Sequence, residues 1–150
     1  MVKSLPDGYH NVTPYLVVAD AEKVLDFTIK AFGAKETVRM PGPDGKVAHA
    51  EVNIGDSIVM MGSPAPSQRL MPAMVYLYVE DTDATYKKAI AVGGKSVEEP
   101  NDAFYGDRRA AVEDSQGNQW FIATHQEDPT PEEMQKRMAA MQKQMEQAKA

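Results

Sequence analysis

His49 and Glu51 are the first residues whose types and spacing suit chemistry. They stand two apart in KVAHAEV, a segment that alternates in polarity and is predicted to be a strand with both side chains on one face. A histidine beside a carboxylate can act as an oriented acid–base pair, or supply two ligands to a metal. The pair also fits a solvated or hydrogen-bonded strand face, so these three interpretations stay open.

The string FYGDRR, residues 104–109, is a second polar cluster. Arg108 can fork onto a ligand carboxylate or phosphate, Tyr105 can stack or donate a hydrogen bond, and Asp107 can orient the arginine. The alternative is a turn in which Gly106 supplies an unusual backbone angle and Asp107 pairs with Arg108 for structural reasons. The sequence leaves both interpretations open.

Two further histidines, His10 and His125, lie just before the first predicted strand and at the end of the last one. Either can rim a pocket, although a lone histidine at a strand end is more often a surface or capping residue. There is no P-loop, no dinucleotide fingerprint and no nucleophile elbow. There is also no cysteine, which excludes thiolate nucleophiles, disulfides and cysteine-ligated zinc.

The composition of the 150 residues is that of one globular domain, with a net charge of −6 that argues against nucleic-acid binding. No apolar run approaches the roughly 20 residues of a membrane span, and the N-terminus has no apolar signal region. We therefore expect a soluble cytoplasmic protein without nucleic-acid or membrane partners.

An internal repeat indicates which elements position these residues. YLVVAD at 15–20 returns as YLYVED at 76–81, an offset of 61 (76 − 15). Each copy reads as a strand, an aspartate N-cap, an amphipathic helix and a glycine stop. Three strands follow in each half, with a loop, PNDAFYGD, after the first strand of the second half. The pattern predicts an α+β fold of two βαβββ modules, whose sheets together enclose a site in a curved, partly open barrel.

The segments TPYLVVADAEKVLDFTIKAFGAK and VEDSQGNQWFIATH resemble the vicinal oxygen chelate superfamily, which includes glyoxalase I, extradiol dioxygenases and bleomycin-resistance proteins. The FYGDR string is typical of its PhnB-like branch. The resemblance implies a single glyoxalase-like domain at 1–127, with modules at about 8–63 and about 74–126. It also implies a homodimer, in some members with halves exchanged between chains.

Enzymes of this superfamily hold one divalent metal between the two sheets, through His, Glu or Gln on the first and fourth strand of each half. Carried over to this sequence, those positions fall on Thr13, Met60, Met74 and Phe121. Both pairs differ by 61 (74 − 13 and 121 − 60), so the repeat supports the assignment. Threonine is a weak donor, methionine suits soft metals and phenylalanine donates nothing. We therefore expect no metal and no other cofactor.

The pocket that remains is predicted to be aromatic, with a few polar groups. Strand alternation and the FYGDRR string select its ligand-binding residues, which are Thr13, Tyr15, Met60, Met74, Tyr76, Tyr78, Tyr105, Arg108, Gln119 and Phe121. The alternative is that these side chains simply fill a core.

Residues 128–150 form a C-terminal helical extension. Thr130, Pro131 and Glu133 give a capping-box start, and methionines at 134, 138, 141 and 145 form an apolar stripe. The favoured interpretation is packing on its own domain or across a dimer; a lid over the cleft and a frayed tail are the alternatives.

Two functions follow from these observations. The first is a metal-independent protein that binds a partly apolar small molecule in the aromatic cleft. The second is an enzyme of lyase, isomerase or dioxygenase type, with a non-standard metal or acid–base site around His49 and Glu51, or with Arg108 as catalyst.

Overall fold

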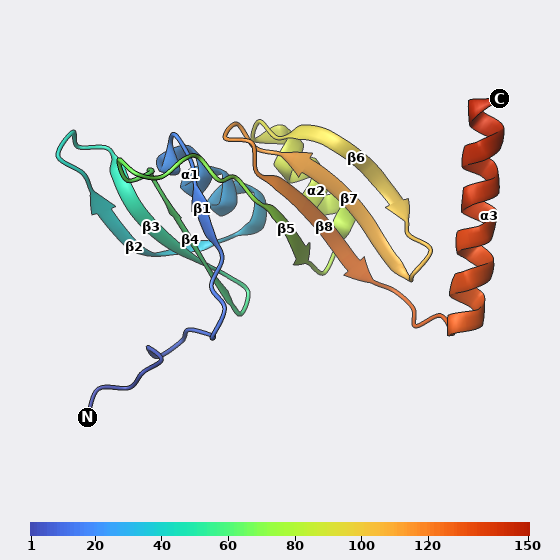
Figure 1. The fold of residues 1–150 in the computed structure, drawn as a ribbon, viewed down its shortest axis with the longest axis horizontal. Coiled ribbons are helices and arrows are strands. Elements are labelled where there is room, and N and C mark those ends of the chain that lie inside the picture. The colour runs from blue at the N-terminus through green and yellow to red at the C-terminus, as the bar shows by residue number, and fades with distance from the viewer.

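The structure is a computed structural model that describes all 150 residues (Figure 1). Its elements in chain order are β1 (Tyr15–Val17), α1 (Ala21–Phe32), β2 (Lys35–Pro41), β3 (Val47–Ile54), β4 (Ser57–Gly62), β5 (Met74–Tyr78), α2 (Thr82–Ala91), β6 (Lys95–Asp102), β7 (Asp107–Glu113), β8 (Gln119–His125) and α3 (Pro131–Lys149).

Each half of the chain forms its own four-stranded sheet, in the order β1-β4-β3-β2 and β5-β8-β7-β6. The first strand of each module pairs in parallel with the fourth, and the other pairs are antiparallel. Tyr15 lies beside Met60, and the equivalent Tyr76 lies beside Phe121. The predicted duplication, its register and the α+β fold are therefore confirmed.

The helices begin and end as the sequence predicts. Asp20 and Asp81 accept hydrogen bonds from the backbone N–H groups of the first turns of α1 and α2. Gly33 ends α1 in the left-handed region, with φ 66°. The predicted PNDAFYGD loop is shorter than expected, because β6 continues through Pro100 to Asp102. A register shift between Glu98 and Asn101 accommodates the proline.

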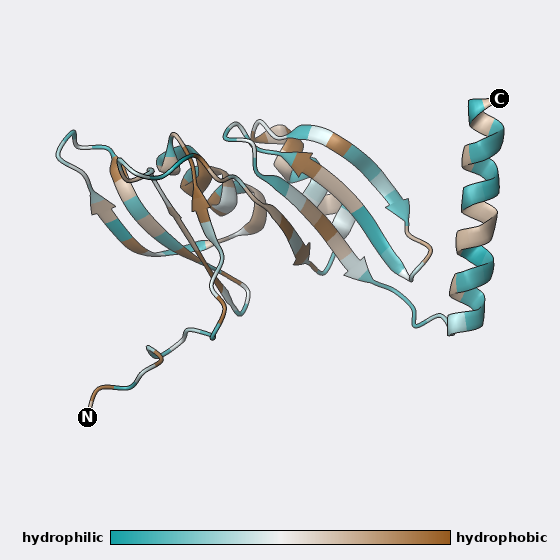
Figure 2. Ribbon diagram, viewed as in Figure 1, coloured by the Kyte–Doolittle hydropathy of each residue, from teal (hydrophilic) through white to brown (hydrophobic).

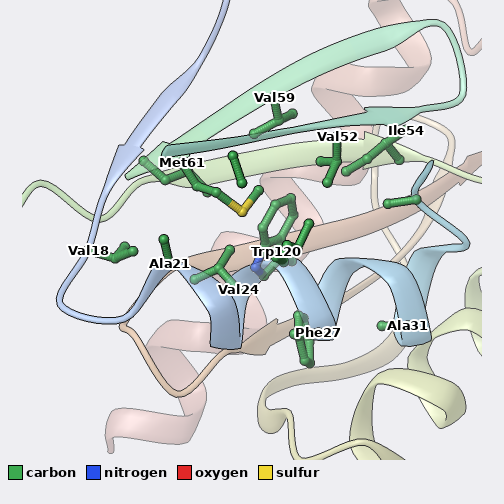
Figure 3. Close-up of a cluster of buried hydrophobic side chains, with 14 of the residues drawn as sticks. Val18, Ala21, Val24, Phe27, Ala31, Val52, Ile54, Val59, Met61 and Trp120 are labelled. Carbon is green, nitrogen blue, oxygen red and sulfur yellow. The ribbon is translucent and has the colours of Figure 1, made fainter. Parts of the chain in front are cut away.

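One apolar core joins the two modules (Figures 2 and 3). Trp120 of β8 is completely buried, and its ring lies 5.2 Å from that of Phe32 at the end of α1. Its indole N–H donates to the buried carboxylate of Asp114. Leu16 and Val18 are buried with it, on the strand faces predicted to pack under the helices. Packing of α1 against α2 completes the junction.

The two modules form separate four-stranded sheets within the chain. No strand of one sheet pairs with a strand of the other, and Figure 1 shows the modules side by side along the long axis. The linker pairs with β1 instead, through two hydrogen bonds between Val17 and Met71. Each sheet therefore has one face in the core and one face open.

The C-terminal helix α3 stands away from both sheets in Figure 1. Thr130 caps it, as predicted, and none of its residues is buried. Arg137 links this helix to the body, because its guanidinium donates to Glu127 and to the carbonyl of Phe104. Three methionines of the predicted stripe are exposed, by 55% in the case of Met145, and Met134 is partly buried. None of the helices has the length and apolar character needed to cross a membrane.

Candidate functional site

The first open face is the surface of sheet one that carries Tyr15, His49, Glu51 and Met60. Tyr15 and Met60 are neighbours across β1 and β4, and Met60 and Glu51 are neighbours across β4 and β3. His49 precedes Glu51 by two residues and shares its face. The adjacent Met61 points the other way and is completely buried in the core. The face is therefore the surface opposite the helices.

Four side chains on this face form a continuous hydrogen-bonded chain. Tyr9, just before β1, donates its hydroxyl to Oε2 of Glu51. The other carboxylate oxygen, Oε1, lies 2.9 Å from Nε2 of His49, and Nδ1 of His49 lies 2.9 Å from the hydroxyl of Tyr15. Glu51 is only 6% exposed, whereas Tyr15 is 43% exposed. The chain thus runs from a buried carboxylate to an accessible phenol.

The environment determines the protonation of both ends of this chain. Burial raises the pKa of Glu51, but the hydrogen bonds from Tyr9 and His49 outweigh it, so the pKa lies below its ordinary value. Burial, followed by the nearby charge of Glu51, raises the pKa of the Tyr15 phenol. The carboxylate is therefore ionised and accepts hydrogen bonds only, and the phenol keeps its proton at neutral pH.

The second open face is the equivalent surface of sheet two, carrying Tyr76, Tyr78, Asp107, Arg109 and Phe121. The tyrosine hydroxyls each lie 2.9 Å from Oδ2 of Asp107. The Tyr76 ring stacks on Phe121 with centroids 6.1 Å apart and planes 9° apart. The guanidinium of Arg109 lies over the Phe121 ring, at 5.5 Å. Predicted lining residues Tyr76, Tyr78 and Phe121 do lie together here.

Asp107 is the centre of the second face and is 2% exposed. In addition to the hydrogen bonds from the two phenols, its Oδ1 lies in hydrogen-bond contact with Nδ1 of His125, at 2.9 Å. Burial raises the pKa of this carboxyl, but the bonds from His125, Tyr76 and Tyr78 outweigh it and lower the pKa. Burial, then the bonds to Tyr105 and Asp107, raises the pKa of Tyr76. The carboxylate is ionised and fully occupied.

Arg109, rather than the predicted Arg108, is the arginine of the open face. Arg108 points to the helix side of β7, where its Nε and Nη2 both lie 3.0 Å from the carboxylate of Asp83 in α2. Arg109 forms a forked pair with Glu98 and donates to the Tyr105 hydroxyl at 3.0 Å. The proposed pairing of Asp107 with Arg108 is replaced by these contacts, because successive residues of a strand face opposite sides.

The positions carried over from the superfamily's metal site do not fit a hard divalent ion. Thr13 and Met60 belong to the first module and Met74 and Phe121 to the second. Their donor set contains no imidazole and no carboxylate. His49 and Glu51 gain no third ligand, since nowhere do three His, Cys, Asp or Glu side chains gather in a metal-binding arrangement.

The remaining predicted residues lie at the edges of the open faces. Met74 is 62% exposed beside Gln119, whose amide donates to Glu113 at 3.2 Å. His10 is exposed, and His125 bridges Asp107 to a second carboxylate at the end of β8. Only His125 of these two is therefore tied to the second open face.

The hollows of the chain lie outside the open faces or at their margin. One of about 410 Å³ is lined by α1 and Arg39 of β2, on the helix side of sheet one. Another, of about 350 Å³, lies between the β3–β4 turn and β5 and includes Tyr76 and Tyr78. No hollow is lined by both open faces, so a single chain offers two open surfaces rather than a closed cleft.

Two contributors were not singled out from the sequence, Tyr9 and Arg109. The position of Arg109 was available from alternation, since it faces the same side as Ala111, the cross-strand neighbour of Phe121. Tyr9 gave no such signal, because it precedes the first strand and reaches Glu51 across 42 residues of sequence.

Comparisons with known proteins agree on the family. A family model described as "Glyoxalase/Bleomycin resistance protein/Dioxygenase superfamily" matches residues 9–122. An uncharacterised protein of Mycobacterium tuberculosis is 34% identical over 140 residues, covering 86% of this chain and 82% of its own length. Among solved structures, TioX from Micromonospora sp. ML1 gives a TM-score of 0.66 at 24% identity, covering 77% of this chain and 98% of TioX. TnmS3 from Streptomyces sp. CB03234, described as an antibiotic binding protein, gives 0.63 at 20%, covering 83% and 99%.

Proposed function

We propose, from the premise that the chain belongs to the glyoxalase/bleomycin resistance protein/dioxygenase superfamily, that it binds a partly apolar small molecule without a metal. The observation that carries this proposal is the composition of the two open faces. They combine aromatic and methionine side chains with a few fixed polar groups, which is the composition of small-molecule sites. The metal positions of the superfamily hold Thr13, Met60, Met74 and Phe121, which are poor ligands for a hard divalent ion. We therefore propose that the ligand contacts these side chains directly.

Exposure supports a binding role over a purely structural one. Tyr15, Met74 and Tyr78 are 43%, 62% and 61% exposed, although a tyrosine or methionine that only fills a core is covered. The polar groups beside them are held in place by hydrogen bonds, as a site that orients a ligand requires. TnmS3 offers a precedent for an organic ligand on this fold, by its description alone. On the FYGDR string we assign the chain to the PhnB-like branch, and we place it in the cytoplasm.

The open faces lead us to propose a homodimer. Each face lacks a covering layer within the chain, and burying such apolar surface contributes about 25 cal/mol per Å². A second copy that set its sheet opposite one of these faces would convert an open surface into a cleft. The predicted consequence is a mass of two chains, with the ligand lost when the dimer dissociates. Native mass spectrometry of freshly purified protein measures subunit number, metal content and any co-purified ligand in one experiment.

A pair of variants tests where the ligand binds. Phe121→Ala removes the ring that stacks on Tyr76, and we expect it to weaken binding of planar aromatic compounds by about fivefold, since such stacking contributes about 1 kcal/mol. Ile90→Ala is the matched control, because it truncates an apolar side chain of α2 that is 37% exposed. Equal binding by both variants, or one metal ion per chain in protein purified without added metal, contradicts the proposal.

An enzymatic function is the second candidate, and the contact between His49 and Glu51 favours it. An imidazole held by a buried carboxylate at 2.9 Å is the arrangement of an oriented general base. The second candidate predicts that His49→Ala abolishes turnover of whatever substrate is found and leaves the fold intact. Unchanged turnover in a folded His49→Ala variant would exclude His49 as the catalytic base.

A further inference from the structure

The hydrogen-bonded chain on the first open face has a direction. Both oxygens of the ionised Glu51 accept, one from Tyr9 and one from Nε2 of His49, so a neutral imidazole carries its hydrogen on Nε2. Nδ1 then has a free lone pair. The Tyr15 hydroxyl, 2.9 Å away, must donate its hydrogen to that lone pair. The exposed end of the chain is therefore the Tyr15 oxygen, which has given away its hydrogen and keeps its acceptor sites.

Gly62 leaves the space in which this contact forms. It lies opposite His49 across β3 and β4, and a Cβ at position 62 would come within 2.5 Å of the Tyr15 oxygen. Any other residue would therefore displace the phenol from the imidazole. The structural equivalent of Gly62 in the second module is Ala123, so this opening is specific to the first face.

The network of the second open face is closed by comparison. The Tyr76 hydroxyl donates a hydrogen bond to Asp107, and its oxygen lies 2.7 Å from the hydroxyl of Tyr105. The Tyr105 hydroxyl in turn accepts a hydrogen bond from Arg109. Asp107 is also hydrogen-bonded to Tyr78 and His125. Each of these groups has its partners inside the network. Tyr78 is also accessible, but its hydroxyl donates directly to the Asp107 carboxylate. The first face differs because the imidazole of His49 lies between the accessible Tyr15 hydroxyl and the carboxylate of Glu51.

We propose that Tyr15, His49 and Glu51 form a proton relay that receives the hydroxyl hydrogen of a phenolic or enolic ligand bound on the first open face. The ligand O–H bond breaks as its proton passes to the Tyr15 oxygen, while the proton of Tyr15 passes to Nδ1 of His49. The products are a ligand oxyanion and an imidazolium, which lies beside the Glu51 carboxylate. This assigns a ligand class to the site and rests on the proposed binding function.

Two matched probes test the relay in the full-length protein. Para-nitrophenol has a weakly acidic hydroxyl, and its phenolate ion absorbs visible light. Para-nitroanisole has the same ring with the hydroxyl methylated. We expect the protein to bind the phenol about five- to tenfold more tightly than the ether, the effect of one net hydrogen bond. Binding should also increase the phenolate absorbance at constant pH. Tyr15→Phe should abolish both differences.

Tyr86→Phe is the control for Tyr15→Phe, because Tyr86 bonds Ser96 at 2.8 Å and lies outside both open faces. It should bind both probes as the unaltered protein does. The chain has three histidines, so the His49 Cε1–H resonance can be assigned with a His49→Gln variant. That resonance should move toward its imidazolium position when the phenol is added, and stay in place when the ether is added.

The outcomes separate the relay from the binding function. If both probes bind with equal affinity, unaffected by Tyr15→Phe, the relay is wrong and the binding function stands. A phenol that binds more tightly but leaves the His49 resonance in place also overturns the proton transfer. If neither probe nor any other planar aromatic compound binds, the binding function fails and the relay fails with it.

Discussion

Asn in place of Asp107 is the most direct perturbation of the second open face. Asp107 is 2% exposed and accepts hydrogen bonds from the hydroxyls of Tyr76 and Tyr78, each at 2.9 Å. It is also hydrogen-bonded to His125. Asparagine has nearly the same shape but no charge, and one of its two terminal atoms donates instead of accepting. The variant therefore keeps the packing and changes only the electrostatics of the network.

The size of the effect follows from the bonds that lose their charge. A hydrogen bond to a charged acceptor contributes about 1.5–3 kcal/mol, against about 0.5–1.5 kcal/mol for a neutral one. The bond from Tyr76 is weakened by about 1 kcal/mol and the bond from Tyr78, which is 61% exposed, by less, so Asp107→Asn should lower the free energy of unfolding by about 1–2 kcal/mol. We count nothing for His125, because it is half exposed and water screens its ion pair. The loss is a large part of the roughly 5–15 kcal/mol that stabilises a domain.

Urea unfolding followed by tryptophan fluorescence is a suitable assay, since Trp120 is the single tryptophan and is completely buried. With a slope of about 1–3 kcal/mol per M, the midpoint should fall by about 1 M. Asp102→Asn is the matched control, because its side chain is 72% exposed, and its midpoint should stay close to that of the unaltered protein. Equal midpoints for Asp107→Asn and Asp102→Asn would refute the idea that Asp107 anchors the second face.

Three more predictions concern backbone, tail and pH. Gly106→Ala should lower the free energy of unfolding by about 2–4 kcal/mol, because Gly106 has φ 106° and a Cβ would lie 2.1 Å from a carbonyl oxygen. Gly45→Ala is the control: Gly45 has φ 78° but open space around it, so the loss in the same urea assay should be about 1 kcal/mol. Deletion of residues 130–150 should change the free energy of unfolding by less than about 1 kcal/mol, because α3 buries no residue. The hydrogen bond to Asp107, followed by that to a second carboxylate, raises the pKa of His125. The stability that His125 contributes is therefore complete below its ordinary pKa of 6.5 and is lost as the pH rises through its folded value, so urea midpoints should decline less toward alkaline pH in His125→Gln.

The repeat predicted each module well because its signals are local. Strand alternation, aspartate caps and glycine stops all act within a few residues, and they predicted that Tyr15 shares a face with Met60 and Tyr76 with Phe121. The repeat carries no information on how the modules sit against each other. That arrangement depends on contacts between distant segments, such as the ring of Trp120 against Phe32. The repeat therefore predicted the fold class and the two modules, but not the contacts between them.

A shift of one residue explains why the polar site was harder to predict than the fold. Asn53 and Ile58 are paired five residues apart, whereas Glu113 and Gln119 are paired six apart (58 − 53 and 119 − 113), so the turn before β8 is one residue longer. The offset between β3 and β7 is consequently 60. On this register Arg109 is the counterpart of His49, and Arg108 faces the helices. A single added residue thus reverses which arginine reaches the open face.

This correspondence also separates the roles of the two faces. Tyr15 and Tyr76 occupy equivalent positions, and each reaches toward the residue that β3 or β7 supplies. Where that residue is His49, a group able to accept and release a proton, the tyrosine ends in an accessible oxygen. Where it is Arg109, which stays charged, the tyrosine joins a network whose members already have partners. Proton chemistry is therefore to be expected on the first face alone, and the second face should contribute apolar stacking and rigidity. If this division is right, Arg109→Ala should leave the ratio of the affinities for para-nitrophenol and para-nitroanisole unchanged, and only changes on the first face should alter that ratio.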